Sequence, residues 1–167
     1  MAMRRYLLLS HLLSAALLSA AAPMASSQAK GDDDVVFVSE KDPEMVAAIR
    51  QARASLPEFL KQAAHPPTGT EGYKLKVMIT DGPRVEHFWV IPFKQEADGF
   101  SGTLANDPQV VRNVKGGQSI RFTSATVTDW GYTRNGRQVG SYTVCVLLKK
   151  MPAQQAEHYR KNYGFDC

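Results

Sequence analysis

The sequence predicts an α+β domain: an N-terminal helix, kinked or broken near Pro57, packed on a curved antiparallel sheet of about five strands, plus a short C-terminal helix. Apolar residues recur at helical spacing between residues 42 and 60. From residue 73 the apolar period changes to two, and turn residues separate short strand-like runs. A final helical pattern begins at Pro152. Helices at both ends with strands between them favour the α+β class.

The N-terminal helix is expected to begin at Asp42, a capping residue, with Pro43 in its first turn. Pro57 has no N–H to donate, so it should kink or end this helix. Ser55 could then cap a second short helix that carries Phe59. Residues rich in proline and glycine follow, and they predict a loop over 63–72.

Runs of alternating or β-branched residues predict strands at 73–80, 85–93, 100–104 and 119–122. One further short strand is predicted before the first helix, at 35–38. Asn106-Asp107-Pro108 resembles a helix start and predicts one short helical turn through residue 114.

Asn135-Gly136 favours a type I′ turn, because both central residues of that turn need positive φ. In such a hairpin residue 134 pairs with 137, Gly131 faces Gly140, and residue 129 faces 142. The run 141–148 is apolar on both faces and predicts an interior strand.

The first 29 residues are predicted to be a cleavable signal peptide. Arg4 and Arg5 precede an uncharged apolar run over 6–22, and small residues dominate 21–29. No cysteine follows this run, so we expect a periplasmic or secreted protein that is not a lipoprotein. The expected organisation is a flexible segment over 30–40, an α+β domain over 41–150, and a C-terminal helix and tail over 151–167.

Removal of the two arginines lowers a net charge that is only +4 in the whole chain. No basic run remains, which argues against nucleic-acid binding. We also expect no stable membrane insertion after signal cleavage. Cys145 and Cys167 are the chain's two cysteines, and an oxidising compartment favours a disulfide between them. The alternative is a small buried apolar residue at 145 and a frayed end at 167.

The chain resembles an uncharacterised family, DUF2314 (YegJ-like). The resemblance depends on short motifs in a fixed order and spacing, at residues 42–45, 52–59, 73–77, 85–90, 99–104, 107–108, 115–117, 128–130 and 140–144. They span about 41–148. The resemblance implies a small α+β domain, often exported, and it implies no catalytic residues.

The candidate binding residues form the chain's densest group of polar, aromatic and glycine positions: Glu86, His87, Trp89, Asp129, Trp130, Gly131, Tyr132, Gly140 and Tyr142. Facing glycines thin a sheet and admit another backbone, and the neighbouring aromatic side chains could contact a partner. Structural roles are the alternative. Trp89 and Trp130 could be core residues, His87 could be bonded across strands, and Asp129 could accept backbone N–H bonds at a strand bend. Glu86 could be an exposed strand carboxylate or could form an ion pair with Lys74 or Lys76. The glycines could mark a bulge or a twist point.

Glu86 and His87 are adjacent in a strand and should point to opposite faces. The other histidines expected after export, His65 and His158, are far apart, so no metal site and no cofactor are expected. Nucleophile motifs are missing from the sequence. The favoured function is therefore a non-enzymatic, protein- or ligand-binding module in the periplasm. The alternatives are an envelope-acting enzyme that uses Glu86, His87 or Asp129, and an immunity or inhibitor protein against a secreted toxin or hydrolase.

Overall fold

A computed structural model describes Ser39 and residues 41–167. The chain divides into residues 1–34 and 35–167, and every described residue belongs to the second unit. The predicted signal peptide, the strand expected at 35–38 and all of segment 30–40 except Ser39 therefore lie outside the described residues.

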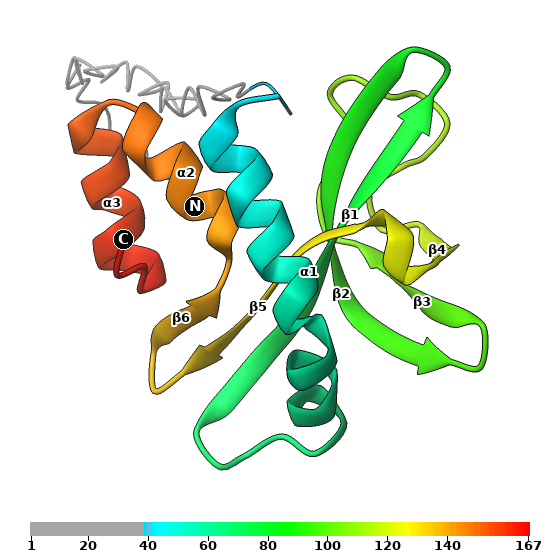
Figure 1. The fold of residues 1–167 in the computed structure, drawn as a ribbon, viewed down its shortest axis with the longest axis horizontal. Helices are drawn as coiled ribbons and strands as arrows, with labels where there is room; N and C mark the ends of the chain where they lie inside the picture. Colours follow the sequence, from blue (N-terminus) through cyan, green and yellow to red (C-terminus); the bar gives the residue numbers. More distant parts are fainter. Residues whose placement is uncertain (1–38, 40) are drawn as a thin grey trace, which may run out of the picture. The chain divides into compact units, whose positions relative to one another are not determined.

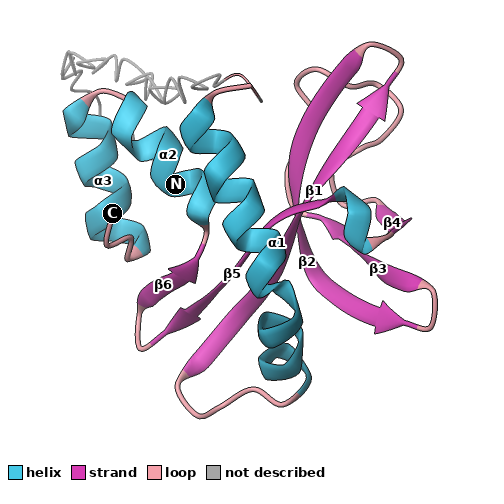
Figure 2. Cartoon of the chain, in the orientation of Figure 1, coloured by secondary structure: helices cyan, strands magenta, loops and turns pink. Residues whose placement is uncertain are grey.

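The described chain forms a six-stranded antiparallel sheet; α1 precedes it in the sequence, α2 and α3 follow it, and the three helices lie together beside its β5–β6 end (Figures 1 and 2). The strand order is β4-β3-β2-β1-β5-β6. The elements are α1 (Pro43–Ala64), β1 (Thr70–Asp81), β2 (Arg84–Glu96), β3 (Gly99–Leu104), β4 (Ser119–Phe122), the 3₁₀ turn η1 (Ser124–Thr126), β5 (Val127–Arg134), β6 (Arg137–Gly140), α2 (Tyr142–Lys150) and α3 (Ala153–Tyr163). The α+β prediction is confirmed, with one strand more than expected.

Helix α1 begins as the sequence predicts but does not end at Pro57. The Asp42 carboxylate accepts hydrogen bonds from the N–H groups of the second and third following residues, at 3.0 and 3.1 Å. Pro57 lies inside one continuous helix. The prediction that Ser55 caps a second helix was wrong, because its hydroxyl donates back to the Gln51 carbonyl at 2.8 Å. Burial of Phe59 in the core offsets the proline's cost of about 3 kcal/mol.

The hairpin at Asn135-Gly136 has the predicted register, but the strand expected over 141–148 is a helix. Arg134 pairs with Arg137, and Gly131 pairs with Gly140. The ladder stops there, because the backbone turns through positive φ at Gly140 and at the next residue. The chain then enters α2. A run that is apolar on both faces suits a buried helix as well as a strand.

The helical turn expected over 107–114 is a loop without helix. Its backbone N–H groups donate to side chains of the β1–β2 hairpin instead of to carbonyls within the loop. Glu86 accepts from residues 109, 110 and 111 at 2.8–3.1 Å. Asp81 accepts from Arg112 N at 2.9 Å. Long-range acceptors thus replace the local bonds that a helix would need.

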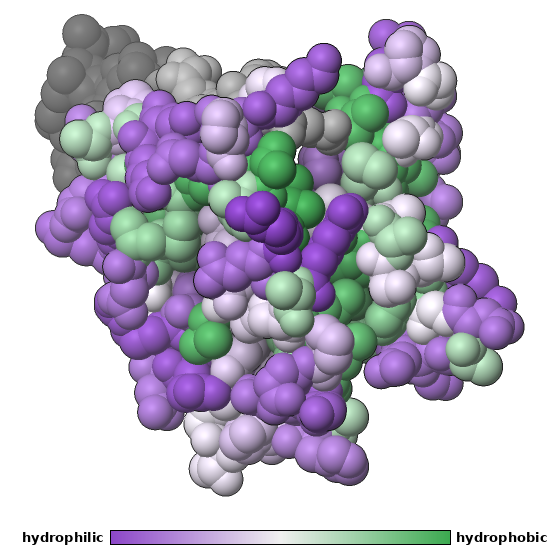
Figure 3. All heavy atoms as spheres, viewed as in Figure 1, coloured by the Kyte–Doolittle hydropathy of each residue, from purple (hydrophilic) through white to green (hydrophobic). Residues whose placement is uncertain are grey.

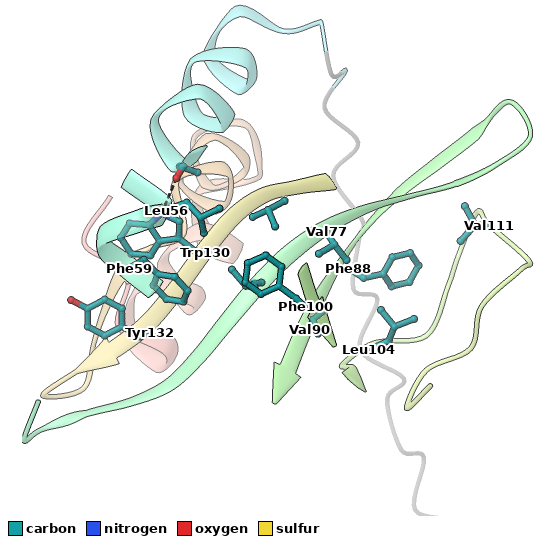
Figure 4. Close-up of a cluster of buried hydrophobic side chains, with 13 residues drawn as sticks. Leu56, Phe59, Val77, Phe88, Val90, Phe100, Leu104, Val111, Trp130 and Tyr132 are labelled. Carbon is teal, nitrogen blue, oxygen red and sulfur yellow. Dashed lines mark hydrogen bonds between the residues drawn. The ribbon is translucent and has the colours of Figure 1, made fainter. Parts of the chain in front are cut away.

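The main core lies on one face of the sheet, with α1 at one end of it and residues of the 105–118 loop at the other (Figure 4). Figure 4 shows its side chains in a line from Tyr132, Phe59 and Trp130 near α1 to Leu104 and Val111 beside the hairpin. In Figure 3, polar residues cover much of the helical side, and apolar residues are visible between the helices and the strands.

A smaller core joins the C-terminal elements. Leu148 of α2, Ala156 of α3 and Phe165 pack together, and Cys145 and Cys167 form a disulfide with a Cα–Cα distance of 5.5 Å. The predicted disulfide and C-terminal helix are both confirmed. No helix among the described residues is long and apolar enough to cross a bilayer.

Candidate functional site

The sheet divides the predicted site residues between two faces. Side chains alternate along a strand, and Phe88 and Val90 of β2 are fully buried in the main core. Glu86 shares their side of β2, whereas His87 and Trp89 project from the opposite side. We call this opposite side the lysine face, defined by Lys74 and Lys76 of β1 with His87 and Trp89 of β2.

Glu86 holds a loop in place. Its two carboxylate oxygens accept three consecutive backbone N–H groups of the 105–118 loop. Lys74 and Lys76 alternate with the core residues of β1 and therefore lie on the other face, so the alternative of an ion pair with Glu86 was wrong. Hydrogen bonds from backbone N–H groups to an ionised carboxylate, as at Glu86, are among the stronger hydrogen bonds in proteins. Glu86 therefore stabilises the long hairpin end.

His87 is bonded across the strands. Its Nδ1 lies 3.0 Å from the Thr128 hydroxyl oxygen. That hydroxyl also lies 3.3 Å from the Lys76 carbonyl oxygen, at the place where the β1–β5 register shifts. The histidine thus helps to link β1, β2 and β5 at an irregularity in the β1–β5 pairing.

Three of the predicted aromatic residues are part of the core instead of a surface platform. Trp130 stacks on Phe59 with ring centroids 4.8 Å apart. Its indole N–H donates to the Ala52 carbonyl of α1 at 2.9 Å (Figure 4). Tyr132 stacks near Trp130, and Tyr142 meets the same indole edge-on. Their role is to fix α1 on the sheet.

Asp129 joins β5 to the start of α2. Its side chain is fully buried. One oxygen accepts from the N–H groups of Trp130 and Tyr142, at 2.8 and 3.2 Å. The other accepts from the N–H and the hydroxyl of Thr143, at 2.8 and 2.6 Å. Burial raises the pKa of this carboxyl, and the hydrogen bonds and the Lys76 charge oppose the rise. This geometry is that of a buried helix cap.

The facing glycines leave no gap for another backbone. A Cβ at Gly140 would come within 2.5 Å of the Trp130 ring. A Cβ at Gly131 would lie 2.5 Å from the Ser141 hydroxyl oxygen and 3.3 Å from Cε of Lys74. Both glycines are therefore needed for close packing within this chain, at the point where the strand turns into α2.

The lysine face holds a cluster that the sequence analysis did not single out. The ammoniums of Lys74 and Lys76 lie over the Trp89 ring, at 4.9 and 5.4 Å from its centroid. Burial lowers the pKa of both lysines, and the charge of Asp129 opposes this shift. The alternation of Lys74 and Lys76 with buried Leu75 and Val77 is the sequence signal that could have revealed the cluster.

Two further features of the described residues bear on function. A shallow groove of about 380 Å³ lies between the end of α1 and β1–β2, lined by Leu60, Ala63, Ala64, Gly72, Tyr73, Ile91, Pro92, Phe93 and Gln95. Within the part of the chain that the structure describes, no group of three or more His, Cys, Asp or Glu side chains is placed to hold a metal ion.

The fold and the site define a class: a small α+β domain whose antiparallel sheet has a core on one face and a lysine–tryptophan cluster on the other. The model of a family described as "Uncharacterized protein conserved in bacteria (DUF2314)" matches residues 42–167, and the chain belongs to this family.

Two curated proteins are similar to this chain. The "Uncharacterized protein YegJ" of Escherichia coli (strain K12) is 34% identical over 116 residues, which cover 70% of this chain and 74% of that protein. The "Putative ankyrin repeat protein NMB1133/NMB1171" of Neisseria meningitidis serogroup B (strain ATCC BAA-335 / MC58) is 26% identical over 86 residues, or 52% of this chain and 34% of that protein. No solved structure matches. The family description assigns no activity.

Proposed function

We propose that this protein is an exported, non-enzymatic module that binds a ligand or partner at the lysine face. The observation that carries the proposal is the position of Trp89. It lies on the face away from α1, it is only partly buried, and two ammoniums lie over its ring. Partly exposed aromatic side chains with charged neighbours are common anchors in binding sites.

An enzyme that uses Glu86, His87 and Asp129 has less support. Such a mechanism needs its acid and base groups within hydrogen-bond reach of one substrate. Glu86 is on the core side of β2 and holds three backbone N–H groups. Asp129 is fully buried and accepts four bonds. Both carboxylates are already engaged in structural contacts, and they lie on different faces.

Binding at the lysine face can be tested by NMR with the chain's own two tryptophans. Trp89 lies in the proposed site, and Trp130 lies in the core. We expect fractions of an envelope extract to shift the indole N–H signal of Trp89 and to leave that of Trp130 in place. Trp89→Ala lacks this signal, so its binding is followed by the backbone amide signals of Lys74 and Lys76, and we expect the variant to abolish binding. Tyr163→Ala, which removes an aromatic ring that is 53% exposed on α3, should retain it. If no fraction moves the Trp89 signal, or both signals move together, the lysine face is not the site.

Export is tested separately by cell fractionation and mass spectrometry. The sequence pattern of residues 1–29 supports it. We expect mature protein in the envelope fraction with Lys30 at its N-terminus. Leu12→Asp combined with Leu13→Asp, which interrupts the apolar run, should keep the full-length chain in the cytoplasm. Unprocessed wild-type protein in the cytoplasm would refute export without touching the binding proposal.

A further inference from the structure

The lysine face has more hydrogen-bond donors than its own acceptors can use. Each ammonium has three N–H donors. Lys76 Nζ donates to the Thr143 hydroxyl at 3.1 Å, and Lys74 Nζ donates to the Gln138 side-chain oxygen at 3.4 Å. Both of these acceptors are neutral. The remaining N–H donors of the two ammoniums have no hydrogen-bond acceptor among the described residues.

The cluster also carries more positive than negative charge. Among the described residues, Asp129 is the carboxylate whose charge acts on Lys74 and Lys76. Each of its oxygens already accepts two hydrogen bonds from Trp130, Tyr142 and Thr143. Two partly dehydrated cations therefore share one carboxylate that has no free position for them. A dehydrated cation without a counter-ion is costly, and an anion beside it lowers that cost.

A buried hydroxyl adds a third donor at the same place. Ser141 is fully buried, and its Oγ has no hydrogen-bond partner among the described residues. A Cβ at Gly131 would lie 2.5 Å from this Oγ and 3.3 Å from Cε of Lys74, so the two side chains approach the same point over Gly131. Its backbone is held at φ 54°, ψ 38°, a left-handed conformation that is uncommon for serine. An unpaired buried hydroxyl in a strained residue calls for an explanation, and a ligand acceptor is one. Because Ser141 is fully buried, a ligand reaches its hydroxyl only if a neighbouring side chain such as Lys74 moves.

We infer that Lys74, Lys76 and Ser141 form a binding site for a small oxyanion, a phosphate- or carboxylate-bearing ligand. The ammoniums supply charge-assisted hydrogen bonds, the serine hydroxyl supplies a neutral one, and the Trp89 ring holds the two lysines in position through cation–π contacts. This inference rests on the proposed function, because it states which chemistry the lysine face recognises.

The test is calorimetric titration of the protein, purified as the cell produces it, with inorganic phosphate and with citrate at low salt. We expect at least one of them to bind. Lys74→Gln and Lys76→Gln should each raise the Kd roughly tenfold or more, since each removes a charge-assisted bond. Added salt should weaken binding. Phosphate binding without citrate binding would identify a phosphate ligand, and the converse a carboxylate ligand.

Matched variants separate a built site from general charge attraction. Lys61→Gln makes the same charge change at a side chain that is 76% exposed on α1, and it should leave the Kd unchanged. Ser141→Gly removes the hydroxyl and relieves the positive φ. It should weaken anion binding severalfold while the protein remains at least as stable, which a purely structural role would not produce.

Two results would overturn the inference. One is no binding of either anion up to about 10 mM, a concentration above which binding is too weak to be specific. The other is an equal loss of affinity in Lys61→Gln. If envelope fractions still shift the Trp89 signal while both anions fail, the oxyanion inference is wrong and the proposed binding function survives. If neither experiment shows binding, both are wrong.

Discussion

Asp129→Asn perturbs the contact that converts the end of the β5–β6 hairpin into a helix. The variant preserves side-chain shape but exchanges one oxygen for an NH₂ group. Each carboxylate oxygen accepts two hydrogen bonds. Whichever oxygen is replaced, two donors face another donor: either the N–H groups of Trp130 and Tyr142, or the N–H and hydroxyl of Thr143.

The magnitude follows from these bonds. A buried donor left without an acceptor costs about 1–3 kcal/mol, and the Thr143 hydroxyl can rotate away. Loss of the carboxylate removes one buried charge, but it also removes the carboxylate that acts on Lys74 and Lys76. These two effects oppose each other. We therefore expect Asp129→Asn to lower the free energy of unfolding by about 2 kcal/mol. Thr143→Ala, which removes the hydroxyl and leaves the carboxylate, should cost about 1 kcal/mol.

The assay is urea unfolding with the disulfide intact, together with hydrogen exchange of the Tyr142 and Thr143 amides. Asp98→Asn is the matched control, since Asp98 is exposed in the β2–β3 turn, and it should leave the urea midpoint unchanged. If Asp129→Asn costs less than about 0.5 kcal/mol, or the α2 amides exchange no faster, the carboxylate does not hold the start of α2.

Three further predictions concern stability. Cys167→Ser should lower the free energy of unfolding by about 3 kcal/mol, the chain-entropy value for a disulfide that closes 22 residues, and equal urea midpoints with and without reductant would contradict this. Asp42→Ala should lower the urea midpoint, because it removes the helix cap. Hydrogen bonds from Lys150 and the helix N-terminus hold the pKa of Asp42 below its ordinary 3.8. The cap therefore stabilises the fold fully above pH 3.8, and this stabilisation is lost as the pH falls through the lower folded pKa. An Asp42→Ala variant whose urea midpoint kept the wild-type pH dependence at acid pH would refute this. Gly131→Ala should cost about 1–3 kcal/mol through overpacking against the Ser141 hydroxyl, and Ser141→Gly in the same chain should restore most of it; no rescue would place the clash elsewhere.

Local signals in the sequence predicted the parts of the fold that depend on neighbouring residues. The Asp42-Pro43 pair marks the start of α1, because a capping carboxylate acts within the first turn. Asn135-Gly136 sets the hairpin register, because a two-residue turn leaves one way to pair the strands. Alternation along β1 and β2 likewise identifies which residues lie in the core.

The same signals failed wherever a distant group decided the outcome. The run 141–148 is apolar enough for either a strand or a buried helix, and Asp129 supplies the acceptors that begin a helix there. Loop 105–118 has a helix-start motif, yet Glu86 takes its backbone donors. Pro57 remains inside α1 because the core on the sheet buries the residues on both sides of it.

For the candidate site, the sequence by itself determined the chemical types that are present and, through strand alternation, that Glu86 and His87 face opposite ways. The tertiary structure decided which of them meet. It placed Trp130 in the core and left Trp89 on the other face beside two lysines. The physical reason is that a tryptophan's surroundings depend on the register of strands joined through distant turns and on where α1 packs. Neither is encoded in the residues next to the tryptophan.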